Sequence, residues 1–468
     1  MLSSKLRSIF ALLLRETAIL PPICTYAEEV LHKQPLGGEL YLATQGIDVM
    51  TILDTVIVGA GQAGLGVSYF LQQKGRKHIV FEQGRIGESW LSQRWDSFKL
   101  NTPNFMNALP GFHYDGLEPD GFWRPDELVH YFQSYIEHFQ LPVRTGVTVV
   151  SVEQSEDEGH FIVKTKTNGQ REESVTSRSV VIASGSQRMP KYPATRARLP
   201  DDIVQLHTAD YRSAAALPPG AVVVVGSGQS GCQITEDLLS AGRTVYLCTS
   251  KVGRVPRRYR GRDTLEWLID MKFLDVTFAS LEDKASSRAA QAQVSGLGRY
   301  GHTVSLQSLA RQGAVILGRL LEAEEDTLTL SNDAATYVRF ADELSQRIKD
   351  GIDGYLAQAG ITPPPIEADP ADMPDPLAGC VSSLRRLNLR EAKVSTVIWA
   401  TGFTADFGWI HLPVLDAEGL PIHQRGISQV HGLYFIGFPW LNSRKSGIIY
   451  GIPEDAHYIT DAISEQLA

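Results

Sequence analysis

The stretch that decides the fold reads Thr55-Val-Ile-Val-Gly-Ala-Gly-Gln-Ala-Gly64. A run of apolar residues leads into Gly59, Gly61 and Gly64 at the spacing G-x-G-x-x-G, and the apolar face of a helix follows. In such a unit the first glycine permits a tight turn and the second admits a pyrophosphate to the backbone. The third lets the helix pack on the strand. The stretch therefore predicts a βαβ unit that binds a dinucleotide at a helix N-terminus.

The next predicted strand, His78-Ile-Val-Phe-Glu82, ends in a carboxylate 18 residues after Gly64. A carboxylate at this place accepts hydrogen bonds from a ribose 2′-hydroxyl. We therefore expect Glu82 to favour a dinucleotide with a free adenosine ribose, such as FAD. The alternative is a βαβ unit with a tight turn and no ligand.

A second unit, Ala221-Val-Val-Val-Val-Gly-Ser-Gly-Gln-Ser-Gly231, repeats the pattern. Its predicted cofactor-binding residues are Gly226, Gly228, Ser230 and Gly231. The residue 18 positions beyond Gly231 is Thr249, where the first unit has its acid. The two units therefore differ at the position that contacts the ribose.

Basic residues follow the second unit at 251–262. They are Lys251, Arg254, Arg257, Arg258, Arg260 and Arg262. An acid would repel a 2′-phosphate, whereas basic residues accommodate it. We therefore expect NADPH at the second site, with Thr249 at the strand end and with Lys251 and Arg254 as phosphate contacts. The alternative for this run is a solvated surface face.

Two such units in one chain indicate that hydride passes from a nicotinamide to a flavin. The apolar segments 180–186 and 396–403 both end in a small-residue turn with glycine and are expected to connect the two domains. Gly432–Gly437 is predicted as a last buried strand, followed by a helix from about Gly447.

The expected fold is α/β, with two Rossmann-type dinucleotide-binding domains and the NADPH domain inserted in the FAD domain. Residues 50–195 and 391–468 are expected to form the FAD-binding domain. Residues 196–390 are expected to form the NADPH-binding domain with a helical insert. Residues 1–49 are predicted to be a dispensable N-terminal extension.

Composition narrows the function class. The 468 residues carry a formal net charge of −9, which argues against a nucleic-acid binder with a basic surface. No apolar run reaches the length of a membrane span, so no membrane span is expected. The histidines do not cluster at metal-ligand spacing, so no metal is expected. The default compartment is the cytoplasm.

Four segments carry a resemblance to a known family: GAGQAG at 59–64, GSGQSG at 226–231, ATGF at 400–403 and Gly87-Glu-Ser-Trp90. Over about residues 52–460 the chain resembles the flavin-containing monooxygenase superfamily, the class B flavoprotein monooxygenases. Segments 432–440 and 256–263 look most like its bacterial CzcO-like subgroup.

One motif of this family is only half present. His207 and Tyr211 fit the second half of F-x-G-x-x-x-H-x-x-x-Y/W, but Asp201 and Ile203 stand where Phe and Gly are expected. The resemblance implies that His207 is a catalytic residue that orients the linker at the nicotinamide ribose. A structural histidine is the competing interpretation.

The resemblance also implies roles on the flavin side. Asn101 matches the family's flavin-side asparagine, the second predicted catalytic residue, and Trp90 is expected to wall the flavin. Gly402 and Gly437 are expected to line the cofactor sites. A turn residue and an ordinary buried aromatic are the alternatives for Asn101 and Trp90.

The implied activity is that of an NADPH-dependent monooxygenase with FAD. It activates O2 as a C4a-(hydro)peroxyflavin and transfers one oxygen atom to a small organic substrate, by N-, S- or Baeyer–Villiger-type oxygenation. The alternatives are an NADPH:FAD oxidase or reductase and a flavin-binding regulatory protein linked to cation transport. The substrate and the assembly, a homodimer included, stay open.

Overall fold

The structure is a computed structural model that describes residues 52–468, except 156–158, 168, 170, 289–290 and 299. The predicted extension at 1–49 lies outside the described residues. Two parallel sheets organise the described chain, and each is built around one of the two glycine-rich units.

The first sheet is centred on β1 (Leu53–Val58), which is fully or largely buried along its second half. It pairs in parallel with β2 (His78–Phe81) on one side and with β6 (Arg171–Ile182) on the other. The order across the sheet is β19 (His423–Gln424), β20 (Ile427–Ser428), β21 (Leu433–Phe435), β6, β1, β2 and β3 (Val143–Arg144), with β4 (Val147–Gln154) and β5 (Phe161–Thr167) as an antiparallel extension of β6.

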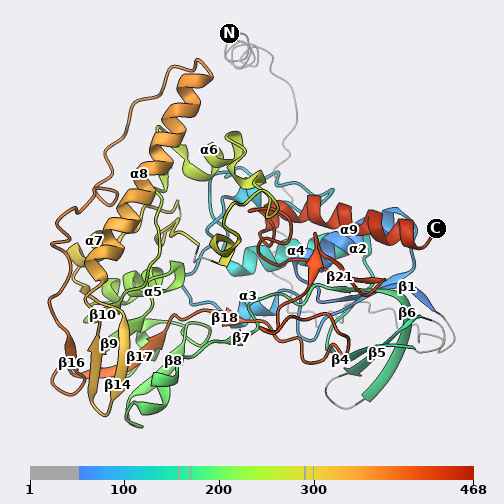
Figure 1. Cartoon of the computed structure of the whole chain (residues 1–468), viewed down its shortest axis with the longest axis horizontal. Helices are drawn as coiled ribbons and strands as arrows, with labels where there is room; N and C mark the ends of the chain where they lie inside the picture. Colours follow the sequence, from blue (N-terminus) through green and yellow to red (C-terminus); the bar gives the residue numbers. More distant parts are fainter. Residues whose placement is uncertain (1–51, 156–158, 168, 170, 289–290, 299) are drawn as a thin grey trace, which may run out of the picture. The chain divides into compact units, whose positions relative to one another are not determined.

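The second sheet has its glycine-unit strand, β9 (Ala221–Val225), in the corresponding place (Figure 1). The strands in order are β13 (Val315–Leu317), β10 (Val245–Cys248), β9, β17 (Val394–Trp399) and β8 (Val204–His207), and each neighbouring pair is parallel. In both sheets the strand of the glycine unit therefore lies between the strand that follows it in sequence and a strand that arrives from elsewhere in the chain.

The strand β17 corrects one expectation about segment boundaries. The FAD part was expected to resume at residue 391, but Val397 of β17 pairs with Val223 of β9 and with Gln205 of β8. The chain therefore leaves the second sheet after Trp399. Two short strands, β7 (Met189–Pro190) and β18 (Phe403–Thr404), pair antiparallel where the chain enters and leaves this part.

The region expected to be a helical insert is of mixed structure. A long helix, α8 (Ala334–Gln358), is present as expected. The region also holds β13 and a three-stranded sheet of β14 (Leu320–Glu324), β15 (Thr327–Leu330) and β16 (Arg386–Asn388). Sequence patterning missed these strands because they are short. The remaining elements are β11 (Arg258–Tyr259), β12 (Arg262–Asp263), α6 (Thr264–Asp270) and α7 (Leu306–Arg311).

The helices place the glycine turns. Helix α2 (Gln62–Gln73) follows β1 and packs along α9 (Ile452–Gln466) and α4 (Pro125–Phe139) (Figure 1). Helix α5 (Gln229–Ser240) follows β9 and packs on β9 and β10. A short helix, α3 (Glu88–Ser92), contacts α4. Among the described residues, no helix is both long enough and apolar enough to cross a membrane.

Candidate dinucleotide sites and their junction

The first glycine turn has the geometry that the sequence predicts. Gly59 has φ +105°, and a Cβ built there would lie 2.5 Å from the carbonyl oxygen of Ala183. A Cβ on Gly64 would lie 1.9 Å from the carbonyl oxygen of Gly59, so only glycine lets α2 approach β1 this closely. A Cβ on Gly61 would meet nothing within 4 Å. This open side is where a pyrophosphate can approach the backbone.

The second turn repeats this geometry residue by residue. Gly226 has φ +109° and would place a Cβ 2.5 Å from the carbonyl oxygen of Ala400. A Cβ on Gly231 would lie 1.9 Å from the Gly226 oxygen, and one on Gly228 would meet nothing within 4 Å. The chain therefore contains two cradles of the same shape.

The strand ends beside the first turn supply its polar and small residues. Glu82 accepts hydrogen bonds from the backbone N–H of Ala60 at 3.0 Å and of Gly84 at 2.9 Å. Each carboxylate oxygen has a further lone pair, so a ribose hydroxyl can still bind. Gly437, at φ +84°, lies so close to α2 that a Cβ there would be 2.7 Å from the Cβ of Ala63. The turn, Glu82 and Gly437 are thus brought together.

The strand end beside the second turn is different. Thr249 is buried, and its hydroxyl donates to the carbonyl of Leu317 at 2.7 Å, so its side chain holds β13 in place. Ser230 is half-buried in the first turn of α5. Lys251 is exposed, and its ammonium lies 4.8 Å from the ring centroid of Phe340. Lys251 is therefore available to an anion, whereas Thr249 is already engaged.

Arg254 does not have the surroundings of a phosphate contact. It is 1% exposed, and it forms ion pairs with Asp342 of α8, at 2.7 Å, and with Asp372. Its guanidinium also donates to the carbonyl of Asp372 at 3.0 Å. The predicted phosphate role of Arg254 is wrong in this structure, because two carboxylates distant in sequence already neutralise it.

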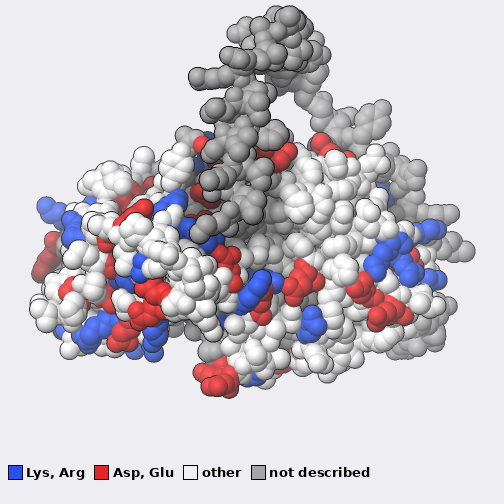
Figure 2. All heavy atoms as spheres, turned by 90° about the horizontal axis from the view of Figure 1, so that it is seen from above, with Lys and Arg blue, Asp and Glu red and all other residues white. Residues whose placement is uncertain are grey.

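Most of the basic run is neutralised in the same way. Arg257 pairs with Asp263, Arg260 with Asp353 at 2.6 Å, and Arg262 with Glu266 and Asp270, both at 2.8 Å. On the face drawn in Figure 2, basic and acidic side chains are interspersed. The run is therefore mainly a set of ion pairs that fix α6, α8 and the β11–β12 hairpin.

Asn101 lies where the two units meet. Its side-chain oxygen accepts a hydrogen bond from Gln233 Nε2 at 3.2 Å, and its carbonyl accepts one from Arg257 at 2.9 Å. Gln233 belongs to α5, the helix of the second glycine turn. Because Gln233 fixes the oxygen of the Asn101 amide, the Nδ2 group is oriented as a donor and has no partner among the described residues. This arrangement suits a donor to a bound cofactor.

His207 is a structural residue here, contrary to the predicted catalytic role. It is 0% exposed, and its two ring nitrogens bond to backbone groups, the Gly402 carbonyl at 2.9 Å and the Ala209 N–H at 3.2 Å. Burial lowers its pKa, which keeps the ring neutral. Because the His207 ring donates to the Gly402 carbonyl, it holds the turn at this glycine, which has φ +79°. A Cβ on Gly402 would meet nothing within 4 Å.

Trp90 lies half-buried in α3, 6.3 Å between ring centroids from Phe98. No contact among the described residues joins it to the first glycine turn, so its predicted place against the flavin stays a prediction.

Sequence reasoning missed several residues of this region. Gln233 and Arg257 hold Asn101, and the buried hydroxyl of Ser184, beside Gly59, has no partner in the described structure. Ser184 could have been found, because Ala183-Ser-Gly185 covers the first turn as Ala400-Thr-Gly402 covers the second. No local signal singles out Gln233 or Arg257, since their contacts are set by tertiary packing.

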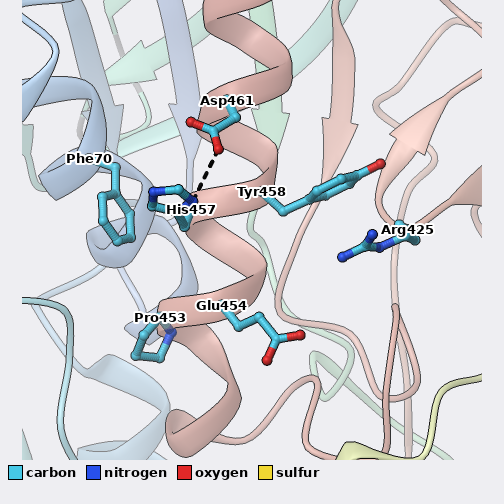
Figure 3. A pocket seen from close by; sticks show the side chains of 7 residues that line it. All are labelled: Phe70, Arg425, Pro453, Glu454, His457, Tyr458 and Asp461. Carbon is cyan, nitrogen blue, oxygen red and sulfur yellow. Dashed lines mark ion pairs between the residues drawn. The ribbon is translucent and has the colours of Figure 1, made fainter.

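A surface hollow along α9, with Phe70 of α2 on one side and Arg425 on the other, contains none of the predicted site residues. It is lined by Phe70, Arg425, Pro453, Glu454, His457, Tyr458 and Asp461, and His457 pairs with Asp461 at 3.1 Å (Figure 3). Throughout the part of the chain that the structure describes, no three His, Cys, Asp or Glu residues are grouped so as to hold a metal ion.

The two cradles fit two dinucleotides. Each has an open second glycine before a helix N-terminus, where backbone N–H groups can bind phosphates. The first cradle has a carboxylate beside it, as a free adenosine ribose requires, and the second has an exposed lysine instead. The residues present thus fit FAD at the first turn and NADPH at the second.

Comparisons with known proteins agree with this geometry. The family model "Pyridine nucleotide-disulphide oxidoreductase" matches residues 56–269. The oxidoreductase CzcO of Bacillus subtilis, itself described as uncharacterized, is 31% identical over 408 residues, 87% of this chain and 97% of that protein. A probable indole-3-pyruvate monooxygenase of Arabidopsis thaliana, YUCCA3, is 29% identical over 53% of this chain and 57% of its own length.

Solved structures share the fold. A flavin-containing monooxygenase from Stenotrophomonas maltophilia is 17% identical with a TM-score of 0.59, covering 90% of this chain and 100% of the other. OTEMO, solved with FAD and NADP, is 16% identical with a TM-score of 0.51, covering 88% of this chain and 85% of the other. The chain therefore belongs to the CzcO group of oxidoreductases, and it shares the fold of the flavin-containing monooxygenases.

Proposed function

We propose that this protein is an FAD-containing, NADPH-dependent monooxygenase that transfers one atom of O2 to a small organic substrate. In this proposal the first sheet and the C-terminal segment form the FAD domain, and the second sheet forms an inserted NADPH domain. When bound, FAD supplies hydride acceptance from NADPH and the activation of O2. The observation that carries the proposal is the place of Asn101, which belongs to the first unit and is held by two residues of the second.

The chain's own residues have distinct roles. The N–H groups at the start of α2 and α5 bind the two pyrophosphates, and Glu82 binds the adenosine ribose of FAD. Lys251 binds the 2′-phosphate of NADPH. The Asn101 amide donates a hydrogen bond to the flavin side of the junction, and Gln233 and Arg257 hold it there as positioning residues.

Oxygen transfer is tested with 18O2. NADPH consumption is followed over a panel of amines, sulfides and ketones, and label in the organic product is measured by mass spectrometry. A monooxygenase incorporates one labelled atom for each NADPH consumed in coupled turnover. An oxidase or reductase would return the oxygen as H2O2 with every substrate, and a regulatory protein would show no flavin bleaching by NADPH.

The choice of nicotinamide is tested at Lys251. Lys251→Glu should raise the KM for NADPH about tenfold or more and leave the KM for NADH nearly unchanged, because it removes one charged contact to the 2′-phosphate. Arg258→Glu, in the same basic run, is the matched control. Equal effects on both nucleotides would contradict the assignment of the 2′-phosphate site.

A further inference from the structure

Arg94 is a half-buried cation that has no carboxylate partner among the described residues. Among the described residues its one hydrogen bond goes from NH1 to the adjacent Gln93 carbonyl, at 3.0 Å. Arg254 and Arg257, which are almost fully buried, differ from Arg94 because each is paired with aspartate. Burial lowers the pKa of Arg94 to about 10, so the guanidinium stays charged at neutral pH in surroundings that do not neutralise it. A partly buried guanidinium with free N–H groups can still form charge-assisted hydrogen bonds with an anion.

The two residues beside Arg94 also have polar atoms without partners. Gln93 Oε1 and Trp95 Nε1 are both buried and make no hydrogen bond in the described structure. Buried polar atoms of this kind are uncommon in native proteins, and each one calls for an explanation. The Trp95 indole N–H is a donor that can bind an anion, whereas Gln93 Oε1 is an acceptor and cannot, so the free donors on this segment are Trp95 Nε1 and the remaining N–H groups of Arg94.

Two aromatic rings contact the guanidinium of Arg94. Its central carbon lies 4.9 Å from the ring centroid of Trp90 and 5.4 Å from that of Phe98. Such contacts stabilise the cation, and apart from the NH1 bond to the Gln93 carbonyl they leave its N–H groups without acceptors among the described residues. That edge is a planar fork that matches the two oxygens of a carboxylate or phosphate.

The loop that carries Arg94 belongs to the junction. It runs from α3 to Asn101, the proposed flavin-side donor, and the hydroxyl of Ser97 donates to Asp237 of α5 at 2.6 Å. The N–H of Asp96 donates to the carbonyl of Arg212 at 2.9 Å. Arg94 is therefore on a segment clamped between the first and the second dinucleotide units.

We propose that Arg94 binds an oxyanion at this junction, with a phosphate or carboxylate group accepting two N–H bonds from its guanidinium. The anion has two possible sources, the diphosphate of the flavin dinucleotide or the carboxylate of an organic substrate. The inference rests on the proposed function, because it takes the loop from Trp90 to Asn101 to be the flavin side of the junction.

The test uses the full-length protein with Arg94→Met and Arg94→Lys. Arg85→Met is the matched control, because Arg85 lies on the same segment, is exposed and is ion-paired with Glu88 at 2.7 Å. Two quantities are measured for each protein: the dissociation constant of FAD on reconstitution, and the change in flavin absorbance on titration with benzoate or phenylacetate. The corresponding amides, benzamide and phenylacetamide, serve as uncharged probes.

A flavin phosphate as the anion predicts that Arg94→Met weakens FAD binding about ten- to a hundredfold. A substrate carboxylate predicts unchanged FAD binding and a benzoate or phenylacetate response weakened by the same factor, while the amides behave as with wild type. In both cases Arg94→Lys is affected less, since it keeps the charge and loses the fork, and Arg85→Met behaves as wild type.

The inference is overturned if Arg94→Met binds FAD and responds to both carboxylates as wild type does. If Arg94→Met does not fold, Arg94→Lys decides. The inference is then overturned if Arg94→Lys binds FAD with wild-type affinity and the wild-type protein responds to neither carboxylate. The proposed function fails separately, if the wild-type protein takes up no FAD or its flavin is not reduced by NADPH.

Discussion

At the scale of single residues, the three glycines of each turn have different roles. The first and third glycines are required by the protein itself, since a Cβ at either would collide with a carbonyl oxygen. The second glycine is open in both turns, at Gly61 and Gly228. The fold does not require glycine at this second position, whereas a bound pyrophosphate does. A substitution there therefore tests cofactor binding separately from folding.

This separation is tested with Gly64→Ala and Gly61→Ala. Gly64→Ala should lower the free energy of unfolding by about 3 kcal/mol or more, because its Cβ would lie 1.9 Å from the Gly59 oxygen and α2 must move. Gly61→Ala should cost about 1 kcal/mol at most, the cost of a changed helix N-cap, and should weaken FAD binding. Urea unfolding of the apoprotein and FAD titration measure the two effects. Wild-type FAD affinity in Gly61→Ala would contradict a pyrophosphate at this turn.

Asp455 gives a pH dependence of stability. It is 5% exposed near the start of α9, and its Oδ2 has no hydrogen-bond partner in the described structure. Burial raises its pKa from the usual 3.8 to about 6, and a hydrogen bond with Ser446 offsets this only in part. Between these two values the folded protein holds a proton that the unfolded chain releases, so stability falls as the pH rises through this window.

Asp455→Asn should remove this loss. Above pH 6 the variant is expected to be more stable than wild type by about 2 to 3 kcal/mol, and near pH 4 the difference should vanish. Chemical unfolding at a series of pH values measures it. Asp461→Asn on the same helix is the control, because the hydrogen bond from Lys74 lowers the pKa of Asp461 and its removal stabilises nothing. A constant difference between Asp455→Asn and wild type across this range would argue against the shift.

At the scale of elements, sequence patterning succeeded where a structure is local. The strand, turn and helix around Gly59 are contiguous, and the strand that ends at Phe81, directly before Glu82, follows them closely in sequence. Patterning failed where the partner is remote, as with Arg254, whose carboxylates stand 88 and 118 residues away. His207 failed for the same reason, because the carbonyl of Gly402 that accepts its hydrogen bond is 195 residues away. A sequence motif identifies a candidate residue, but tertiary packing determines which partner that residue binds.

The corrected role of Arg254 makes a prediction about α8. Arg254→Met leaves Asp342 and Asp372 buried without their main cation, although Lys349 still pairs with Asp372 at 2.7 Å. It should therefore lower the free energy of unfolding by about 3 to 5 kcal/mol. It should change the KM values for NADPH and NADH alike, in contrast to Lys251→Glu.

Urea unfolding and steady-state kinetics measure both effects of Arg254→Met. Arg260→Met is the control, because it removes a more exposed ion pair of α8, with Asp353, and should cost less stability. A loss of NADPH affinity alone, with stability unchanged, would restore Arg254 to the phosphate site.

At the scale of the whole molecule, the strand of each glycine unit has the same neighbours in its sheet, and Asn101 lies where the two units meet. In the first sheet β1 lies between β2, the next strand in sequence, and β6, which returns from later in the chain. In the second sheet β9 lies in the same way between β10 and β17. The residues that directly follow those returning strands, Ala183 and Ala400, lie against the first glycine of each turn. The repeat gives two binding turns, and the bond between Asn101 and Gln233, like that between Ser97 and Asp237, joins a residue of the first unit to the helix of the second.

Gln233 is the test of whether that contact matters to the reaction. Gln233→Leu removes the bond of Nε2 to Asn101 and the bond to the Ser295 carbonyl at 3.1 Å, so the Asn101 amide is free to rotate. We expect FAD content to match wild type and the rate of flavin reduction by NADPH to fall about tenfold, because a misplaced donor and nicotinamide cost orientation rather than binding. Stopped-flow absorbance under anaerobic conditions measures the rate. Ser97→Ala is the control, since it also removes a junction hydrogen bond, to Asp237, but at an exposed contact. Equal rates in the two variants would mean that the junction only fastens the two units together, and a slower rate in Gln233→Leu alone would mean that it also sets the geometry for transfer.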